Sequence, residues 1–208
     1  MKRIIHCAWT GNNEMSYERE ECLEYLKQFT DCEVKCVYRD DIASYLVEGH
    51  PLHPAYQYLS DTHKADYFRT YLMNFHGGAY CDIKRPSGSW LPAFNDLETS
   101  DAWMNGYPEL DGGAAVGAWQ DIIGNGGYIC KPHTPLTEEW YSEVVKFLDD
   151  KLEELKKNPA SHPQDCAEGS KYPIEWNELG GRIFHRVALN YKDKLLRTVP
   201  MPVCRWYR

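Results

Sequence analysis

The sequence predicts an α/β domain whose central, mostly parallel sheet is flanked by helices. The first observation is a strand–helix–strand pattern at the start of the chain, over residues 2–9, 16–29 and 33–38. The second is a helical pattern over residues 54–76 that ends at Gly77-Gly78 and leads into a short apolar strand at 79–83. A chain of 208 residues without an internal repeat has the length of a domain with one hydrophobic core, so we expect residues 1–208 to form a single domain.

The opening pattern is defined by its turn and cap residues. Residues 2–9 are mostly apolar, and Thr10-Gly11-Asn12-Asn13 follows as a turn cluster. Ser16 is a good helix N-cap, and the acidic residues just after it favour the positive end of the helix dipole. The apolar residues of this helix recur at helical spacing, and residues 33–38 then predict the second strand.

The helix expected within residues 54–76 has two distinct faces. Ala65, Phe68 and Leu72 share one face and are expected to pack on the sheet. Asp66 and Arg69 share another face, at a spacing that brings their side chains together. Taken alone, such a pair is most often a surface ion pair of small energetic value.

The second half of the chain predicts a less regular succession of elements. Short strands are expected at 102–107 and 128–130, with glycine-rich connections at 111–113 and 124–127. Residues 137–158 predict the longest helix, which Pro159 stops. Residues 158–171 predict a loop, and 174–191 predict a helix interrupted at Gly180-Gly181.

Composition excludes several classes of function. The net charge of −8 argues against a nucleic-acid-binding protein, since phosphate contacts require clustered Lys and Arg. No apolar run is long enough to span a membrane. The eight cysteines include no Cys-x-x-Cys pair and no apolar leader precedes the first strand, so we expect free thiols in a cytoplasmic protein.

Familiar enzyme motifs are missing from the sequence. It contains no phosphate-loop motif, and Trp9-Thr10-Gly11 stands where a dinucleotide-binding glycine motif would follow the first strand. It contains no His-Glu-x-x-His and no Gly-x-Ser-x-Gly. A nucleotidyltransferase would need a basic phosphate loop near the N-terminus, and residues 9–16 contain no Lys or Arg.

The most informative segment runs from residue 64 to residue 84. A helix presents Asp66 and Arg69, a glycine pair ends it, and a short buried strand follows and leads into Asp82. Such a carboxylate lies at the sheet edge where α/β proteins bind ligands. There it can hold a divalent cation against a diphosphate, or bind sugar hydroxyls. As single features, Asp82 could equally cap a turn and Gly77-Gly78 could simply end a helix.

This segment resembles the GT-A glycosyltransferases that carry an Asp-X-Asp motif. The family pattern is Ala/Ser-Asp-x-x-Arg, an apolar spacer, then Gly-Gly-x-Tyr-x-Asp-x-Asp, and residues 65–69 and 77–82 follow it. Members include capsule and polysaccharide sugar transferases, yeast mannosyl chain initiators and glucosylating clostridial toxins. The layout, with Trp9-Thr10-Gly11 after the first strand and Tyr-Pro-Ile-Glu-Trp-Asn at 172–177, is also similar to glycosyltransferase domains of large algal viruses.

The resemblance implies a role for each matched residue. Asp66 is expected to bind donor-sugar hydroxyls, and Arg69 to hold the sugar or the diphosphate. Trp9 is expected to lie at the nucleotide base, where its alternative is a core or rim aromatic. Thr10 and Gly11 are expected to allow close approach of the nucleotide.

The resemblance also implies a metal ion, Mn²⁺ or Mg²⁺, held by Asp82. His185 is the late metal-ligand candidate, although a buried histidine is more often structural. The sequence departs from the family at Lys84, which replaces the second Asp of the motif, and a protonated lysine ligates no metal. Either Asp82 holds the cation with other partners, which we expect, or Lys84 itself neutralises the diphosphate.

The expected function is transfer of a hexose or deoxyhexose from a nucleoside diphosphate sugar, UDP-linked, to a glycan acceptor hydroxyl. The resemblance implies retention of anomeric configuration and a place in polysaccharide or glycoprotein glycan synthesis, in the host-cell cytosol if the protein is viral. The alternative is a non-catalytic nucleotide-sugar- or carbohydrate-binding module of the same fold, which the Lys84 departure motivates. Release of nucleoside diphosphate separates the two.

Overall fold

The computed structural model describes residues 1–113 and 117–203. Within these residues six strands form one sheet in the order β2-β1-β3-β5-β4-β6. Their bounds are β1 Ile4–Trp9, β2 Glu33–Tyr38, β3 Gly78–Cys81, β4 Met104–Pro108, β5 Ile123–Cys130 and β6 Leu195–Leu196. Strand β1 pairs in parallel with β2 and β3, and β4 pairs in parallel with β6, whereas β5 runs antiparallel to β3 and β4. The predicted α/β fold with a mostly parallel central sheet flanked by helices is confirmed.

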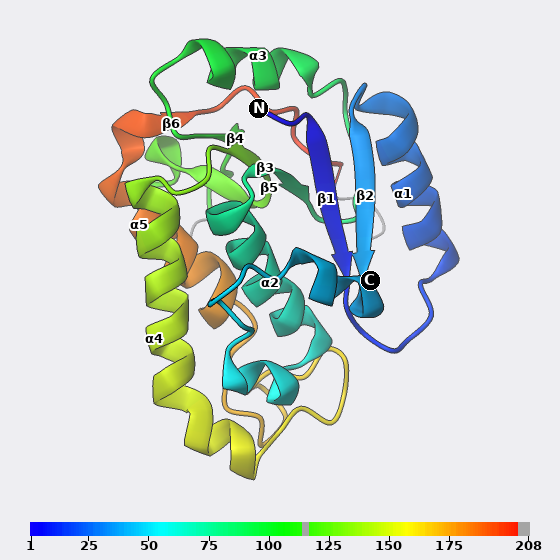
Figure 1. The fold of residues 1–208 in the computed structure, drawn as a ribbon, viewed down its shortest axis with the longest axis vertical. Helices are drawn as coiled ribbons and strands as arrows, with labels where there is room; N and C mark the ends of the chain where they lie inside the picture. The colour runs from blue at the N-terminus through cyan, green and yellow to red at the C-terminus, as the bar shows by residue number, and fades with distance from the viewer. Residues whose placement is uncertain (114–116, 204–208) are drawn as a thin grey trace.

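Helices cover both faces of this sheet (Figure 1). The α-helices are α1 Tyr17–Phe29, α2 Asp61–Phe75, α3 Leu91–Thr99, α4 Pro135–Lys157 and α5 Ile183–Asn190. Short 3₁₀ segments lie at η1 Arg39–Tyr45, η2 Pro54–Tyr58, η3 Trp119–Asp121 and η5 Lys192–Lys194, and η4 Glu178–Arg182 is a π-helical turn that runs into α5. In Figure 1, α1 lies beside β2 at one edge of the sheet, and α4 runs along the opposite side of the molecule.

Alternation along the strands produces two separate hydrophobic cores. Tyr80 packs with α2, α4 and α5 on one face, whereas Ala79 and Cys81 pack with α1 and α3 on the other. This is the period of two that strand geometry imposes. The α2 face is rich in buried aromatic residues, including Tyr67, Phe68, Tyr128, Trp140 and Phe184.

The elements predicted for the first half of the chain are mostly confirmed. The side chain of Ser16 accepts a hydrogen bond from the Arg19 amide and caps α1. Phe68 and Leu72 are fully buried against the sheet, whereas Ala65 instead lines the cavity described below. The helix expected over 54–76 divides in two, because the Ser60 side chain caps a new helix by accepting from the His63 amide.

Two predictions for the second half were wrong in detail. Residues 124–127 are part of β5 and not a connection, since Tyr107 of β4 covers Gly124 so closely that no Cβ fits there. The helix expected from residue 174 begins only at Glu178. Helix α4 is confirmed, with Thr134 as its cap. Helix α3 and strand β6 were not predicted.

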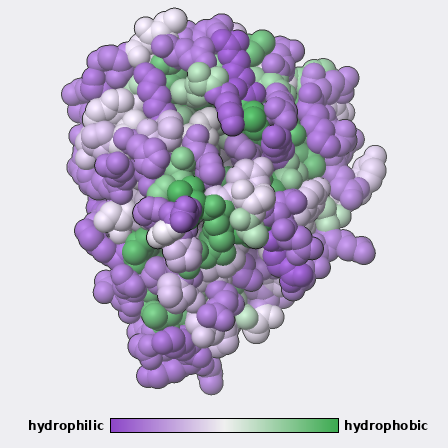
Figure 2. Space-filling view, viewed as in Figure 1, coloured by the Kyte–Doolittle hydropathy of each residue, from purple (hydrophilic) through white to green (hydrophobic). Residues whose placement is uncertain are grey.

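The polarity of the surface and the state of the cysteines are as the composition predicts. Hydrophilic side chains cover most of the face in Figure 2, and hydrophobic side chains gather near its centre. Every cysteine in the described residues is free. In the same part of the chain, no helix combines the length and apolar character needed to cross a membrane.

Candidate functional site

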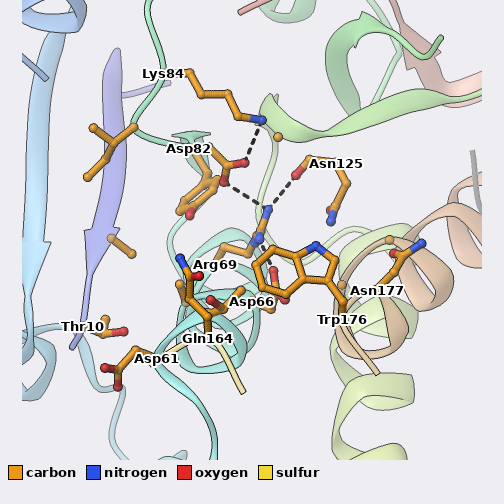
Figure 3. Close-up of a pocket in the computed structure, with 18 of the residues that line it drawn as sticks. Thr10, Asp61, Asp66, Arg69, Asp82, Lys84, Asn125, Gln164, Trp176 and Asn177 are labelled. Atoms are coloured by element: carbon orange, nitrogen blue, oxygen red, sulfur yellow. Dashed lines mark hydrogen bonds and ion pairs between the residues drawn. The ribbon is translucent and has the colours of Figure 1, made fainter. Parts of the chain in front are cut away.

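A cavity of about 950 Å³ opens where β1 and β3 end. A cavity of this size accommodates a small-molecule ligand of the size of a nucleotide. The residues of its wall come from segments far apart in the sequence, as Figure 3 shows. They include Trp9 at the end of β1, Thr10 and Gly11 just after it, Asp66 and Arg69 on α2, Asp82 and Lys84 after β3, Asn125 and Gly126 on β5, and Gln164, Trp176, Asn177 and His185.

Four charged side chains alternate in sign across the floor of this cavity. Arg69 forms an ion pair with Asp66, and its Nη1 lies 3.4 Å from Oδ1 of Asp82. The other oxygen of Asp82, Oδ2, lies 3.2 Å from Nζ of Lys84. All four side chains are at most 18% exposed, so these charges interact in a partly dry environment. The structure therefore brings together the matched residues of the 64–84 segment, and the surface-pair alternative for Asp66 and Arg69 is wrong.

Arg69 is fixed in place from several directions. Its Nη1 donates to the Asn125 carbonyl at 2.7 Å, and the guanidinium carbon lies 5.0 Å from the centre of the Tyr80 ring. Burial acts to lower the pKa of Arg69, but the neighbouring Asp66 and Asp82 hold it well above its ordinary value. The guanidinium therefore stays charged and oriented before any ligand arrives.

Glycines let the backbone come close to these charges. A Cβ on Gly180 would lie 3.1 Å from the side-chain Nδ2 of Asn125 and 3.2 Å from the Asp66 carboxylate. A Cβ on Gly126 would lie 3.0 Å from the Tyr107 hydroxyl and 3.1 Å from Nζ of Lys84. Gly180 belongs to the π-helical turn η4, a distortion that is frequent at functional sites.

The residues predicted for the nucleotide lie together at one end of the cavity. Trp9, Thr10 and Gly11 all line it, and Thr10 is 3% exposed. The indole nitrogen of Trp9 donates to the Asn13 carbonyl at 2.9 Å, and the ring is partly buried against the core that α1 and α3 form. A Cβ on Gly11 would lie 2.5 Å from an Asp61 oxygen, so a larger residue here would displace the Asp61 side chain.

His185 lines the same cavity as Asp82 but pairs with a different carboxylate. Its Nε2 lies 3.3 Å from Oε2 of Glu109, and the histidine is 2% exposed. Burial acts to raise the pKa of Glu109, but the hydrogen bond from His185 and the Leu110 amide hold it below its ordinary value. Glu109 is therefore ionised at neutral pH.

The residues around Asp82 fit a preformed metal site poorly. The two oxygens of Asp82 face the cations of Arg69 and Lys84, and positive neighbours disfavour a third positive charge. Among residues 1–113 and 117–203, no cluster of three or more His, Cys, Asp or Glu side chains is placed to hold a metal ion. Asp82 offers a single carboxylate, so substrate phosphates and water would have to supply most ligands of a Mg²⁺-type ion here.

Sequence reasoning missed Arg19, which also lines the cavity. Its Nη1 donates to the Ile83 carbonyl at 2.6 Å, next to Asp82 and Lys84. One signal was present: a positive charge in the first turn of a helix opposes the helix dipole. A locally unfavourable choice of this kind often marks a functional residue.

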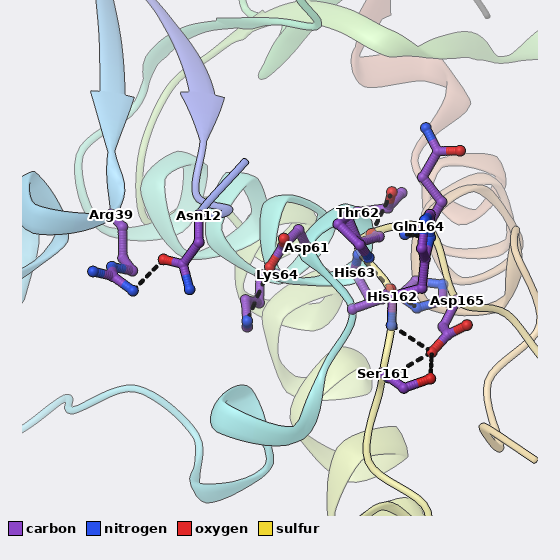
Figure 4. Close-up of polar contacts among 12 residues, drawn as sticks. Asn12, Arg39, Asp61, Thr62, His63, Lys64, Ser161, His162, Gln164 and Asp165 are labelled. Carbon is purple, nitrogen blue, oxygen red and sulfur yellow. Dashed lines mark hydrogen bonds and ion pairs between the residues drawn. The ribbon is translucent and has the colours of Figure 1, made fainter. Parts of the chain in front are cut away.

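A loop between α4 and η4 closes one side of the cavity and contributes Gln164 and Trp176. Asp165 folds this loop by accepting hydrogen bonds from the amides of Ser161 and His162, at 2.6 and 2.8 Å (Figure 4). The Pro163 carbonyl accepts from the Thr62 amide at 3.2 Å, which ties the loop to the start of α2. Trp176 is 49% exposed at the rim of the cavity.

Comparison with known proteins supports the fold. No protein-family model matches the chain, and no curated protein matches its sequence. Among solved structures, the PaToxG glycosyltransferase superimposes with a TM-score of 0.56 at 12% identity, over 91% of this chain and 69% of that one. The galactosyltransferase LgtC, solved with donor and acceptor sugar analogues, gives a TM-score of 0.44 at 14% identity, over 93% of this chain and 72% of that one. The chain therefore has a GT-A-like glycosyltransferase fold, with its cavity at the carboxyl ends of β1 and β3.

Proposed function

We propose that this chain is a glycosyltransferase that moves a hexose or deoxyhexose from a UDP-sugar to a hydroxyl of a glycan acceptor. The observation that carries the proposal is the buried sequence of charges Asp66, Arg69, Asp82 and Lys84 on the floor of a cavity at the carboxyl ends of β1 and β3. Ligands of open α/β sheets bind at this edge. The likeness of the fold to PaToxG supports the same reaction class.

The chemical difficulty of the reaction is charge that develops in the transition state. Negative charge grows on the departing diphosphate, and positive charge grows on the sugar ring. The guanidinium of Arg69 is already charged and fixed, so it can bind the donor without reorganising. The Asp66 carboxylate is 5% exposed and can orient sugar hydroxyls.

Trp9, Thr10 and Gly11 are proposed to bind the nucleotide. An indole that is held by a hydrogen bond and lines the cavity can stack against a base, and the glycine turn lets the backbone contact the edge of the base. The preference for uracil and the retention of anomeric configuration are proposals that follow from the resemblance of the 64–84 segment.

The acceptor is proposed to enter between Trp176 and Glu109. A half-exposed tryptophan at the rim of a polar cavity is suited to stacking against a sugar ring. Glu109 is ionised and held by His185, so it can accept a hydrogen bond from an acceptor hydroxyl. Both residues line the cavity that holds the charged floor.

A second candidate is a nucleotide-sugar-binding module without turnover. Lys84 in place of the second motif carboxylate favours it, because the family pattern places a metal ligand there. Both candidates predict donor binding, which a thermal-shift screen of nucleotide sugars tests. A ligand that binds only the folded state raises the melting temperature. We expect UDP-sugars to raise it in the wild type and to do so much less in Arg69→Ala. A screen in which no nucleotide sugar changes the melting temperature contradicts both candidates.

A further inference from the structure

Lys84 and Arg19 converge on the short segment that follows β3. The ammonium of Lys84 lies 3.2 Å from the Asp82 carboxylate, and the Arg19 guanidinium donates to the Ile83 carbonyl at 2.6 Å. The two cations come from different elements, since Arg19 belongs to α1. Both line the cavity, and the Lys84 side chain is only 12% exposed.

The carboxylate of Asp82 is flanked by positive charges. Its two oxygens lie 3.4 Å from Nη1 of Arg69 and 3.2 Å from Nζ of Lys84, and the Arg19 guanidinium lies at the neighbouring residue, Ile83. Asp61, Asp66 and Glu109 also line the cavity and add negative charge to it. The cations next to Asp82 nevertheless disfavour binding of a further cation to this carboxylate.

We propose that Lys84 and Arg19 bind the diphosphate of the donor directly, in place of a divalent cation. The inference rests on the proposed function, because it assigns the diphosphate of that same donor to these two side chains. A lysine binds phosphate as a point charge, and a guanidinium has five donors that suit phosphate oxygens. Anchored cations of this kind stabilise the charge of a leaving diphosphate without help from a metal.

The neighbouring groups are arranged to support this role. The Tyr107 hydroxyl accepts from the Gly126 amide at 3.1 Å, and a Cβ on Gly126 would meet both this hydroxyl and Lys84. The nucleotide end of the cavity, at Trp9, Thr10 and Gly11, belongs to the same continuous space. A diphosphate between that end and the charged floor can therefore reach both cations.

The test is calorimetric titration of the protein with UDP, and with GDP in parallel, in excess EDTA and in Mn²⁺. We expect the wild type to bind UDP with the same affinity, within about twofold, in both conditions. Lys84→Met and Arg19→Met are each expected to weaken UDP binding about tenfold or more in EDTA. Lys146→Met and Arg186→Met, exposed positions on α4 and α5, serve as matched controls and should bind as the wild type does.

Two further variants guard against a loss that arises from misfolding. Lys84→Arg keeps the charge and should retain most of the affinity in EDTA. Lys84→Asp restores the family carboxylate, so its UDP binding should fall in EDTA and recover in Mn²⁺. Wild-type binding that disappears in EDTA and returns with Mn²⁺ overturns the inference but leaves the proposed function standing. Absence of UDP and GDP binding in both conditions overturns the two together.

Discussion

The Arg69 guanidinium lies 3.4 Å from the Asp82 carboxylate and so ties helix α2 to the end of strand β3. The same guanidinium pairs with Asp66 on its own helix. A site assembled in this way has few independent parts, because each charged side chain holds the next one in position.

Asp82→Asn is expected to reduce turnover by about a hundredfold or more, because it removes the negative charge that pairs with Arg69 and Lys84 on the floor of the cavity. The amide is nearly the same size, so the fold should survive. Turnover is measured as release of nucleoside diphosphate, with circular dichroism as the check on folding. Asp40→Asn, at a carboxylate that is 92% exposed, is the control and should leave turnover unchanged. Near wild-type turnover in a folded Asp82→Asn protein would remove Asp82 from the site.

Asp66→Asn and Arg69→Ala are each expected to weaken donor binding. A buried charge that loses its partner also costs about 3–5 kcal/mol of stability, so binding is measured by calorimetry well below the melting temperature. Glu153→Ala and Lys156→Ala interrupt an ion pair of the same spacing on the surface of α4. These controls should cost at most about 1 kcal/mol and leave donor affinity unchanged. If the Asp66 and Arg69 variants bind the donor as tightly as the control variants do, Asp66 and Arg69 have only a structural role.

Gly180→Ala is expected to weaken donor binding and to destabilise the fold by about 1–3 kcal/mol. The added Cβ would press on Asn125 and Asp66, at 3.1 and 3.2 Å, and move the floor of the cavity. Gly88→Ala is the control, because its Cβ would meet only Pro200, at 3.8 Å. Urea unfolding and donor titration check both effects. A Gly180→Ala protein with wild-type donor affinity and stability would show that η4 accommodates the added methyl group without moving Asn125 or Asp66.

His6 is expected to make the protein less stable in mild acid. Burial lowers the pKa of His6 from its ordinary 6.5 to about 4, and the histidine is 7% exposed. The folded state therefore disfavours the protonated ring. The contribution of the neutral His6 ring to the free energy of unfolding is complete above pH 6.5 and is lost as the pH falls from 6.5 towards 4. At about 1.4 kcal/mol per pKa unit, the loss amounts to about 3 kcal/mol.

The comparison that isolates His6 is His6→Asn, whose amide can still donate to the Ala79 carbonyl as the ring nitrogen does at 3.3 Å. Urea unfolding at pH 7 and at pH 5 gives the two free energies of unfolding. The wild type should lose more stability than the variant over this range. Equal losses in the two proteins would mean that His6 does not titrate in the folded state as described.

UDP is expected to bind more tightly than GDP. The reasons are the resemblance of the 64–84 segment and the Trp9 ring, which a hydrogen bond to the Asn13 carbonyl holds beside the turn at Gly11. Calorimetry with the two diphosphates measures the difference directly. Tighter binding of GDP would contradict the assignment of residues 9–11 to uracil.

The sequence was most informative where local spacing and function coincide. The spacing of Asp66 and Arg69 predicted that they share one face of a helix, and α2 confirms it. The burial of this pair could not be predicted, because it depends on Asp82, Asn125 and η4 arriving from elsewhere. Arg19 was missed for the same reason: its partner, the Ile83 carbonyl, lies on a different element.

Other misses have local physical causes. Helix α3 begins at Leu91 without a side-chain cap on the preceding residue, so Pro92 in its first turn was the start signal that the sequence carried. Strand β5 was predicted too short, since glycines usually weaken strands. Here Tyr107 covers Gly124, and Trp90 lies 3.2 Å from the Cβ position of Gly127, so neighbouring aromatic rings fill the space that side chains would occupy.

The most direct test of glycosyl transfer is release of nucleoside diphosphate from a panel of UDP-sugars, with and without oligosaccharide acceptors, by the wild type and by Asp82→Asn. We expect the wild type to release nucleotide from at least one UDP-sugar, faster with an acceptor, and the variant to release it about a hundredfold or more slowly. A wild-type protein that binds a UDP-sugar in the cavity yet releases no nucleotide with any acceptor would contradict catalysis and leave a binding module.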